Sequence, residues 1–294
     1  MWGSMMTAMV TPFDADERVD HEAAGRLVRH LIETGSTSIL VSGTTGESPT
    51  LSHDEKLELT KTVLDAAAGE VPVLLGTGSN DTRSSVAFTA EASELPLDGI
   101  MLVTPYYNKP CQDGLFAHFQ AVAAATDKPV MIYNIEARTA RNILPATVGR
   151  LAREVSNIVA VKEASGNIGQ FAAVANAVPE GFLLYSGNDS DTPAIMACGG
   201  VGVVSVASHL AGRTIRAMMD AYWAGDWTLG RTLYLKLMPL VEALFPASSV
   251  SPAPVKAGLA MLGMPCGGLR LPLVDCNDQV KAALAAALKG LDLL

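Results

Sequence analysis

Features that mark several protein classes are scarce in this sequence of 294 residues. Only four cysteines are present, Cys111, Cys198, Cys266 and Cys276, and none belongs to a CxxC pair. A chain of this length needs no disulfide framework, so we expect reduced thiols, as in a cytoplasmic protein. Aromatic residues are also few, at 5%, yet 49% of the chain is hydrophobic. That fraction can fill the core of one large domain or two small ones.

Runs of Lys or Arg are missing as well. The chain has 21 basic and 30 acidic residues and a formal net charge of -9, which makes nucleic acid and anionic membrane surfaces poor partners. No cation precedes Arg18, unlike the basic start of a secretory signal. A long uncharged stretch, residues 192–210, contains Pro193, three glycines and His209. We therefore expect neither a membrane span nor export from the cytoplasm.

Short apolar runs alternate with longer stretches of helical period along the first 225 residues. This alternation is typical of βα units around a parallel sheet. The predicted strands cover residues 6–12, 38–42, 71–77, 100–104, 130–134, 158–162, 183–186 and 201–205. Eight such units predict a (β/α)₈ barrel, with an open doubly wound sheet as the alternative. The first strand is followed by TPFDADERVD instead of a GxGxxG turn, which disfavours the open sheet.

The remainder of the chain contains no strand pattern. Residues 229–245, 254–262 and 280–293 all show helical periodicity. We therefore predict a barrel domain over residues 1–225 and a C-terminal helical extension, packed on the barrel, over residues 226–294.

Active sites of such barrels lie where the strands end, and one strand ends in an unusual residue. Lys162 follows the apolar residues 158–161, where a barrel strand is buried on both faces. Burial lowers the pKa of an ammonium group and favours the neutral amine, which can form a Schiff base with a carbonyl substrate. A structural alternative is an ion pair between Lys162 and Glu163.

Polar residues at neighbouring strand ends fit Schiff-base chemistry. Tyr133 ends the adjacent strand, so its phenol is expected close to Lys162, where it could transfer protons together with Thr44. Gly43 and Gly46 bracket Thr44 and Thr45 and permit a bend that binds a small carboxylate. Alternatively, Tyr133 is a core residue and the threonines only cap a loop.

Other reaction types are disfavoured by what the strand ends contain. The five histidines are scattered, so we predict no metal site. The segment after the seventh strand, residues 188–191, carries two acids that would repel a phosphate. Arg138 follows the fifth strand and can bind a carboxylate bidentately, unless it is an ordinary surface arginine.

Six motifs, in order, are TAMVTPF at 7–13, GTTGESPTL at 43–51, TPYYNKP at 104–110, YNIxxRT at 133–139, VKEAS at 161–165 and SGND at 186–189. Through them, nearly the whole chain resembles the dihydrodipicolinate synthase family. That family belongs to the pyruvate-dependent class I aldolases, which include N-acetylneuraminate lyase. The resemblance implies a lyase that condenses pyruvate with L-aspartate 4-semialdehyde in lysine biosynthesis, without an external cofactor.

The resemblance also assigns roles to individual residues. It implies that Lys162 forms the imine, that Tyr133, Thr44 and Tyr107 relay protons, and that Tyr107 comes from a neighbouring subunit of a homo-oligomer, commonly a tetramer. The residues that it implies for substrate binding are Thr45 for pyruvate, Arg138 for the semialdehyde carboxylate, and the backbone of Gly187 and Val204.

This sequence departs from the family pattern YNIPxRTG at two positions. Glu136 replaces the proline and Ala140 replaces the glycine. If Glu136 pairs with Arg138, binding of the semialdehyde is expected to weaken; if it points outward, the assignment stands.

Many family members are inhibited by L-lysine, and the resemblance places that regulatory site near Ser48, His53, Asn80 and Tyr106. Lysine-sensitive bacterial members typically carry histidine where this chain has Lys56 and glutamate where it has Ser84. A gained cation and a lost carboxylate both disfavour a cationic inhibitor, so we predict weak or absent inhibition.

Two competing hypotheses are consistent with the same residues. One is a different pyruvate aldolase acting on a sugar acid or hydroxy-oxo acid, which would keep Lys162 and Tyr133 but need Arg138 less. The other is a catalytically silent barrel that binds a small acid as a sensor or partner, because a fold alone does not guarantee activity.

Overall fold

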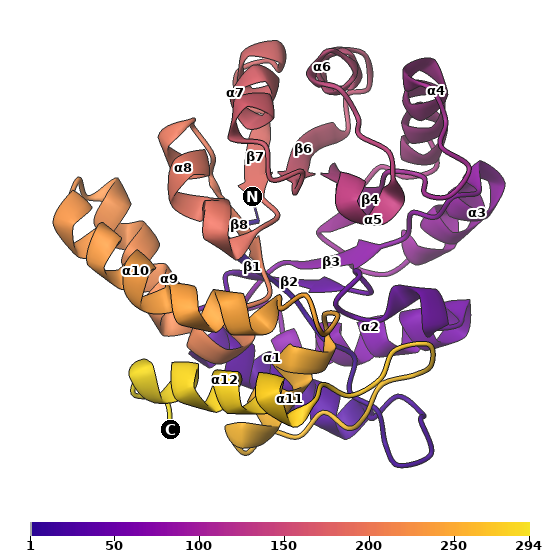
Figure 1. The fold of residues 1–294 in the computed structure, drawn as a ribbon. Coiled ribbons are helices and arrows are strands. Elements are labelled where there is room, and N and C mark those ends of the chain that lie inside the picture. Colours follow the sequence, from indigo (N-terminus) through magenta and orange to yellow (C-terminus); the bar gives the residue numbers. More distant parts are fainter. Residues whose placement is uncertain (1) are drawn as a thin grey trace. The chain divides into compact units, whose positions relative to one another are not determined.

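The computed structural model describes residues 2–294. Its eight strands form a closed barrel in chain order (Figure 1). The pair β1–β2 and all neighbouring pairs from β3 to β8 are parallel. The predicted (β/α)₈ fold is confirmed. The strands are β1 Met5–Ala8, β2 Ser38–Val41, β3 Val73–Gly76, β4 Gly99–Val103, β5 Val130–Asn134, β6 Ile158–Glu163, β7 Leu183–Ser186 and β8 Gly202–Ser205.

Helices connect the strands, as their amphipathic patterns predict. In α1, Ala24, Leu27, Val28 and Leu31 recur at helical spacing and are all buried, while Asp20 caps the first turn. The helices up to the last strand are α1 His21–Glu33, α2 His53–Ala67, α3 Thr82–Ala92, α4 Gln112–Ala123, α5 Glu136–Thr139, α6 Pro145–Glu154, α7 Ile168–Ala177 and α8 Thr192–Ala197, with 3₁₀ turns η1 Ser48–Thr50 and η2 Asp189–Asp191.

After β8 the described chain is helical, which confirms the expected C-terminal helices. These are α9 Ser208–Trp223, α10 Trp227–Leu244, α11 Ala253–Met261 and α12 Asp278–Gly290. Helix α10 packs against α9 and α12, and α11 packs against α12. None of the helices within residues 2–294 is long and apolar enough to cross a membrane.

The chain divides into two compact units. One comprises Val73–Val204 with Gly3, and the other comprises Ser4–Pro72 and Ser205–Leu294 with Trp2. The first unit contains strands β3 to β7 and most of β8, and the second contains β1, β2 and the C-terminal helices.

Several predicted strand ends need correction, the first strand most of all. It was expected over residues 6–12 but ends at Ala8. Beyond that point, Val10 donates its backbone N–H to Nε2 of His209, and Thr11 Oγ1 donates to the carbonyl of Gly46. Partners remote in sequence therefore replace the strand ladder. Strands β5 and β7 match their predicted bounds, and the others differ by one or two residues.

Candidate active site

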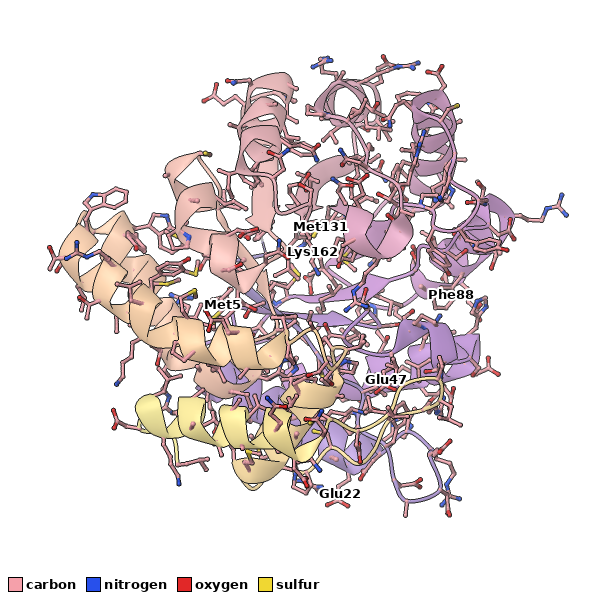
Figure 2. The ribbon with its side chains drawn as sticks, in the orientation of Figure 1. Met5, Glu22, Glu47, Phe88, Met131 and Lys162 are labelled. Atoms are coloured by element: carbon pink, nitrogen blue, oxygen red, sulfur yellow. The ribbon has the colours of Figure 1, made fainter. Side chains whose placement is uncertain are left out.

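Lys162 and Tyr133 come together because of the register between β5 and β6. Their Cα atoms are paired in this parallel ladder. Both side chains are buried, with exposed fractions of 6% and 4%, and the Lys162 Nζ lies 4.0 Å from the centroid of the Tyr133 ring (Figure 2 labels Lys162). The predicted meeting of amine and tyrosine at one rim is thus present in the structure.

Burial changes the acid–base properties of Lys162. Desolvation lowers the pKa of its ammonium group to about 7; the Asp189 carboxylate opposes this change, and the Arg138 guanidinium adds to it. A large share of the amine is therefore neutral near neutral pH, as a nucleophile requires.

The structural alternative for Lys162, an ion pair with Glu163, is wrong. Within residues 2–294 Lys162 forms no ion pair, and the Glu163 carboxylate accepts hydrogen bonds from Asn134, Gln170 and Ser165 instead. Consecutive side chains of a strand point to opposite faces, which separates Glu163 from Lys162. A positive charge on Lys162 is thus not neutralised by its sequence neighbour.

Arg138 lies in α5, a helix of one turn that follows β5. Both Arg138 and Glu136 are exposed, and no ion pair joins them in the part of the chain that the structure describes. The guanidinium is therefore available to an incoming anion. Ala140 ends the turn with a φ of 53°, in the left-handed region that glycine adopts more easily.

Tyr107 is not buried with Lys162 and Tyr133. It follows β4, has a φ of 72°, and its side chain is 89% exposed. Tyr106 is 36% exposed, and the side chain of Asn108 donates to the carbonyl of Asn80 at 2.8 Å, which ties this loop to the one after β3. A role for Tyr107 at a buried site of another subunit stays a prediction.

Thr44 and Thr45 lie on a tight turn after β2. Gly46 N–H donates to the carbonyl of Gly43, and Glu47 N–H donates to that of Thr44, each at 3.1 Å. A Cβ atom on Gly46 would lie 3.0 Å from the carbonyl oxygen of Met9, so the turn needs glycine there. Thr45 is buried and Thr44 half-buried.

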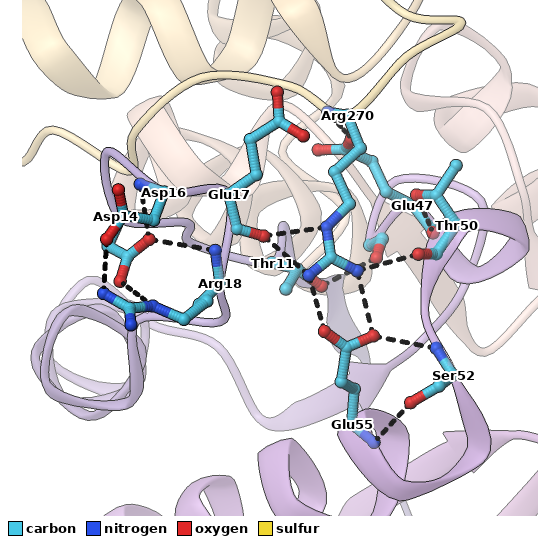
Figure 3. A network of polar contacts seen from close by, with 11 residues as sticks. Thr11, Asp14, Asp16, Glu17, Arg18, Glu47, Thr50, Ser52, Glu55 and Arg270 are labelled. Carbon is cyan, nitrogen blue, oxygen red and sulfur yellow. Dashed lines mark hydrogen bonds and ion pairs between the residues drawn. The ribbon is translucent and has the colours of Figure 1, made fainter.

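A charged network that the sequence did not reveal holds this turn, and Figure 3 shows the part of it around Arg270, Glu47 and Thr50. The Glu47 carboxylate forms an ion pair with Lys256 Nζ at 2.7 Å, and both side chains are almost fully buried. The backbone N–H of Arg270 donates to the same carboxylate at 3.1 Å, and its guanidinium donates to the Thr50 carbonyl at 2.8 Å. Lys256 also donates to the carbonyl of Gly268. Over 200 residues separate Lys256 and Arg270 from Glu47 and Thr50, so no local pattern could indicate these contacts.

The other predicted binding residues have well-defined places. Gly187 donates its N–H to the Glu163 carbonyl at 2.7 Å, and an added Cβ would lie 2.4 Å from the Ala164 Cβ, so only glycine fits. Val204 is buried on β8. Among the predicted regulatory residues, Ser48 accepts a hydrogen bond from Ser42, and His53 is exposed at the start of α2.

Comparison with known proteins bears on both fold and activity. The family model described as the dihydrodipicolinate synthetase family matches residues 1–291. The chain belongs to this family. It is 50% identical over 293 residues to the 4-hydroxy-tetrahydrodipicolinate synthase of Desulforudis audaxviator, covering 100% of this chain and 99% of that protein.

Solved structures of the dihydrodipicolinate synthetase family agree. The enzyme from Cyanidioschyzon merolae with lysine bound is 44% identical, with a TM-score of 0.97 and coverage of 100% of this chain and 99% of that one. The chloride-inhibited enzyme from Acinetobacter baumannii complexed with pyruvate is 36% identical, with a TM-score of 0.95 and full coverage of both chains. The predicted activity, that of a 4-hydroxy-tetrahydrodipicolinate synthase and hence a lyase, is confirmed.

Proposed function

We propose that this chain condenses pyruvate with L-aspartate 4-semialdehyde through an imine on Lys162, in the diaminopimelate route to lysine. The observation that carries the proposal is the buried Lys162 amine, with a pKa lowered to about 7, against the Tyr133 ring. Lys256 is the chain's contrasting buried lysine. Burial also lowers its pKa, but its Nζ is held by Glu47 and the Gly268 carbonyl. The Lys162 amine, by contrast, forms no ion pair within the described residues.

The reaction begins when the neutral amine of Lys162 attacks the keto carbon of pyruvate. The carbinolamine loses water to form the imine, and loss of a proton from the methyl carbon gives the enamine. The former methyl carbon of the enamine attacks the aldehyde carbon of the second substrate, and the aldehyde oxygen takes up a proton. The substrate's own amine then displaces Lys162 from the imine carbon, which closes the ring and frees the enzyme.

Each proton transfer in this sequence needs a nearby group. We assign the relay to Tyr133, Thr44 and Tyr107, the last donated by a neighbouring subunit, since its exposed position suits a contact between chains. Thr45 binds the pyruvate carboxylate, and the backbone of Gly187 and Val204 lines the site. Arg138, exposed and free of Glu136, binds the carboxylate of the semialdehyde.

The imine chemistry requires no external cofactor and no metal. We propose a cytoplasmic homo-oligomer, a tetramer built as a dimer of dimers, whose chains consist of a barrel over residues 1–225 and a helical extension over residues 226–294 packed on it.

The decisive experiment traps the imine with borohydride in the presence of pyruvate and maps the adduct by mass spectrometry. The expected result is one pyruvate adduct on Lys162 and none on Lys256. An unmodified Lys162 would favour a silent barrel and overturn the proposal. Rates with aspartate semialdehyde, N-acetylmannosamine and glyoxylate then separate this synthase from other pyruvate aldolases.

A further inference from the structure

Behind the Lys162–Tyr133 pair lies a second pair on the opposite face of the same two strands. Asn134 and Glu163 are the next residues along β5 and β6, and their Cα atoms are paired in the same ladder. Alternation along a strand sends their side chains away from Lys162 and Tyr133. Both are buried, with exposed fractions of 0% and 3%.

The Glu163 carboxylate is surrounded by N–H donors. Asn134 Nδ2 lies 3.1 and 2.9 Å from its two oxygens, Gln170 Nε2 lies 3.0 Å away, and the backbone N–H of Ser165 donates at 2.7 Å. None of the ion pairs found in residues 2–294 includes Glu163. Carboxylate oxygens can accept all of these hydrogen bonds, so the Glu163 side chain is fully hydrogen-bonded without a cation.

From Glu163 the network continues to Asn142, in the segment that follows Arg138. The Asn142 Oδ1 accepts from Asn134 Nδ2 at 2.7 Å and from Gln170 Nε2 at 2.9 Å, and its Nδ2 donates to Gln170 Oε1 at 2.6 Å. The backbone N–H of Ile143 donates to Asn134 Oδ1 at 3.2 Å. The loop is therefore bonded through side chains to the ends of β5 and β6 and to α7.

A second anchor holds the same segment from α4. Gln112 Nε2 donates to the Asn142 carbonyl at 2.9 Å, and its Oε1 accepts from Leu144 N–H at 3.1 Å. Helix α5 itself is one turn long, too short to be stable alone. Arg138 is exposed and makes no ion pair within the described residues, so its own side chain does not hold this segment, and these anchors help to fix its backbone.

We propose that Glu163 is a positioning residue that, through Asn134, Asn142 and Gln170, fixes residues 135–144 and so places the Arg138 guanidinium for the carboxylate of the second substrate. This inference rests on the function proposed above for Arg138. In this proposal Glu163 and Asn134 serve recognition of the aldehyde substrate, whereas Lys162 and Tyr133, on the opposite face of the same strands, serve imine formation with pyruvate.

The test uses steady-state kinetics of the full-length variants Asn142→Ala, Gln170→Ala and Glu163→Gln. The last turns an amide N–H toward N–H donors, which breaks the network at its centre. We expect the KM for aspartate semialdehyde to rise about tenfold or more, as for the loss of a charge-assisted contact. The KM for pyruvate and the yield of borohydride trapping should stay within about twofold of the parent.

Asn157→Ala is the matched control. The Asn157 amide donates to the carbonyls of Ala123 and Thr126 near the start of β6, so its removal costs comparable hydrogen bonds at the other end of the strand. We expect it to lower thermal stability without changing either KM. If Glu163→Gln does not fold, Asn142→Ala and Gln170→Ala carry the test, since both residues are only half-buried.

Arg138→Ala, measured in parallel, separates the two proposals. If it raises the KM for the semialdehyde and the network variants do not, the positioning role is overturned while the role of Arg138 stands. If Arg138→Ala itself leaves that KM unchanged, the proposed function of Arg138 fails. The double variant Arg138→Ala with Asn142→Ala should be no worse than Arg138→Ala alone, and additive losses would contradict action through Arg138.

Discussion

The Nζ atom of Lys162 lies 4.0 Å from the centroid of the Tyr133 ring, and the two residues are opposite one another in the β5–β6 ladder. Backbone hydrogen bonds between two buried strands set this relationship, so it does not depend on a mobile loop. An amine and a phenol held on rigid strands fit the geometric demand of the multistep Schiff-base reaction proposed above.

Imine formation should depend on pH through the Lys162 amine. Because its pKa is lowered to about 7, the rate of borohydride-trappable imine formation should rise with pH and level off above a midpoint near 7. The Asp189 carboxylate raises this pKa, so Asp189→Asn should move the midpoint to lower pH. A midpoint near 10, or no movement in the variant, would contradict the assignment.

Lys162→Met should abolish activity and stabilise the fold. Activity is expected below about one thousandth of the parent, since the nucleophile is lost. The pKa of Lys162 in the folded protein lies below its ordinary value of 10.5, so the stability of the parent rises with pH between about 7 and 10.5. The penalty for burying the cation is complete below about pH 7. Thermal unfolding should therefore show a stabilised variant, by more than about 1 kcal/mol below pH 7 and little near 10.5. Equal stability at low pH would indicate that burial does not oppose the charge.

Tyr133→Phe keeps the ring against Lys162 and removes only the hydroxyl. We expect kcat to fall by about 10²–10⁴-fold, the usual size of a general acid–base contribution. Thermal stability should change little, because the ring still fills its buried place. Unchanged kcat in the steady-state assay would remove Tyr133 from the proton relay.

The buried ion pair between Glu47 and Lys256 should be costly to break on one side. Lys256→Met leaves the Glu47 carboxylate without its cation, and we expect a loss of about 3–5 kcal/mol in unfolding free energy. Glu47→Gln combined with Lys256→Met should recover much of that loss, as denaturant unfolding of all four members of the cycle will show. Because Glu47 ends the turn that carries Thr44 and Thr45, the single variant should also raise the KM for pyruvate. If Lys256→Met leaves the unfolding free energy unchanged, the contribution of the ion pair to stability is contradicted.

L-lysine should inhibit weakly or not at all. Lys56 is half-buried in α2, where burial lowers its pKa. Ser84 lies in the first turn of α3, which contains no acidic residue. In a coupled assay we expect an inhibition constant above about 1 mM. Lys56→His with Ser84→Glu should strengthen inhibition, because a cation is removed and a carboxylate added. Inhibition well below that concentration in the parent chain would show that other residues recognise lysine.

Much of the fold could be predicted from local patterns alone. The strands β5 and β7 were located to the residue, because their apolar runs stop at polar side chains that mark the rim. The first strand was predicted too long, because the N–H of Val10 bonds to His209, a residue 199 positions later in the chain. No local rule could show this partner.

What the sequence by itself determined is the order of the elements, the strand that carries Lys162 and the neighbouring strand that carries Tyr133, since alternation and burial are encoded by adjacent residues. Only the tertiary structure decided that Asn134 Nδ2 donates to the Glu163 carboxylate, that Gln170 bonds to Asn142, and that Lys256 pairs with Glu47. Such contacts join side chains far apart in the chain, and their energy depends on distance and burial after folding, which sequence spacing does not express.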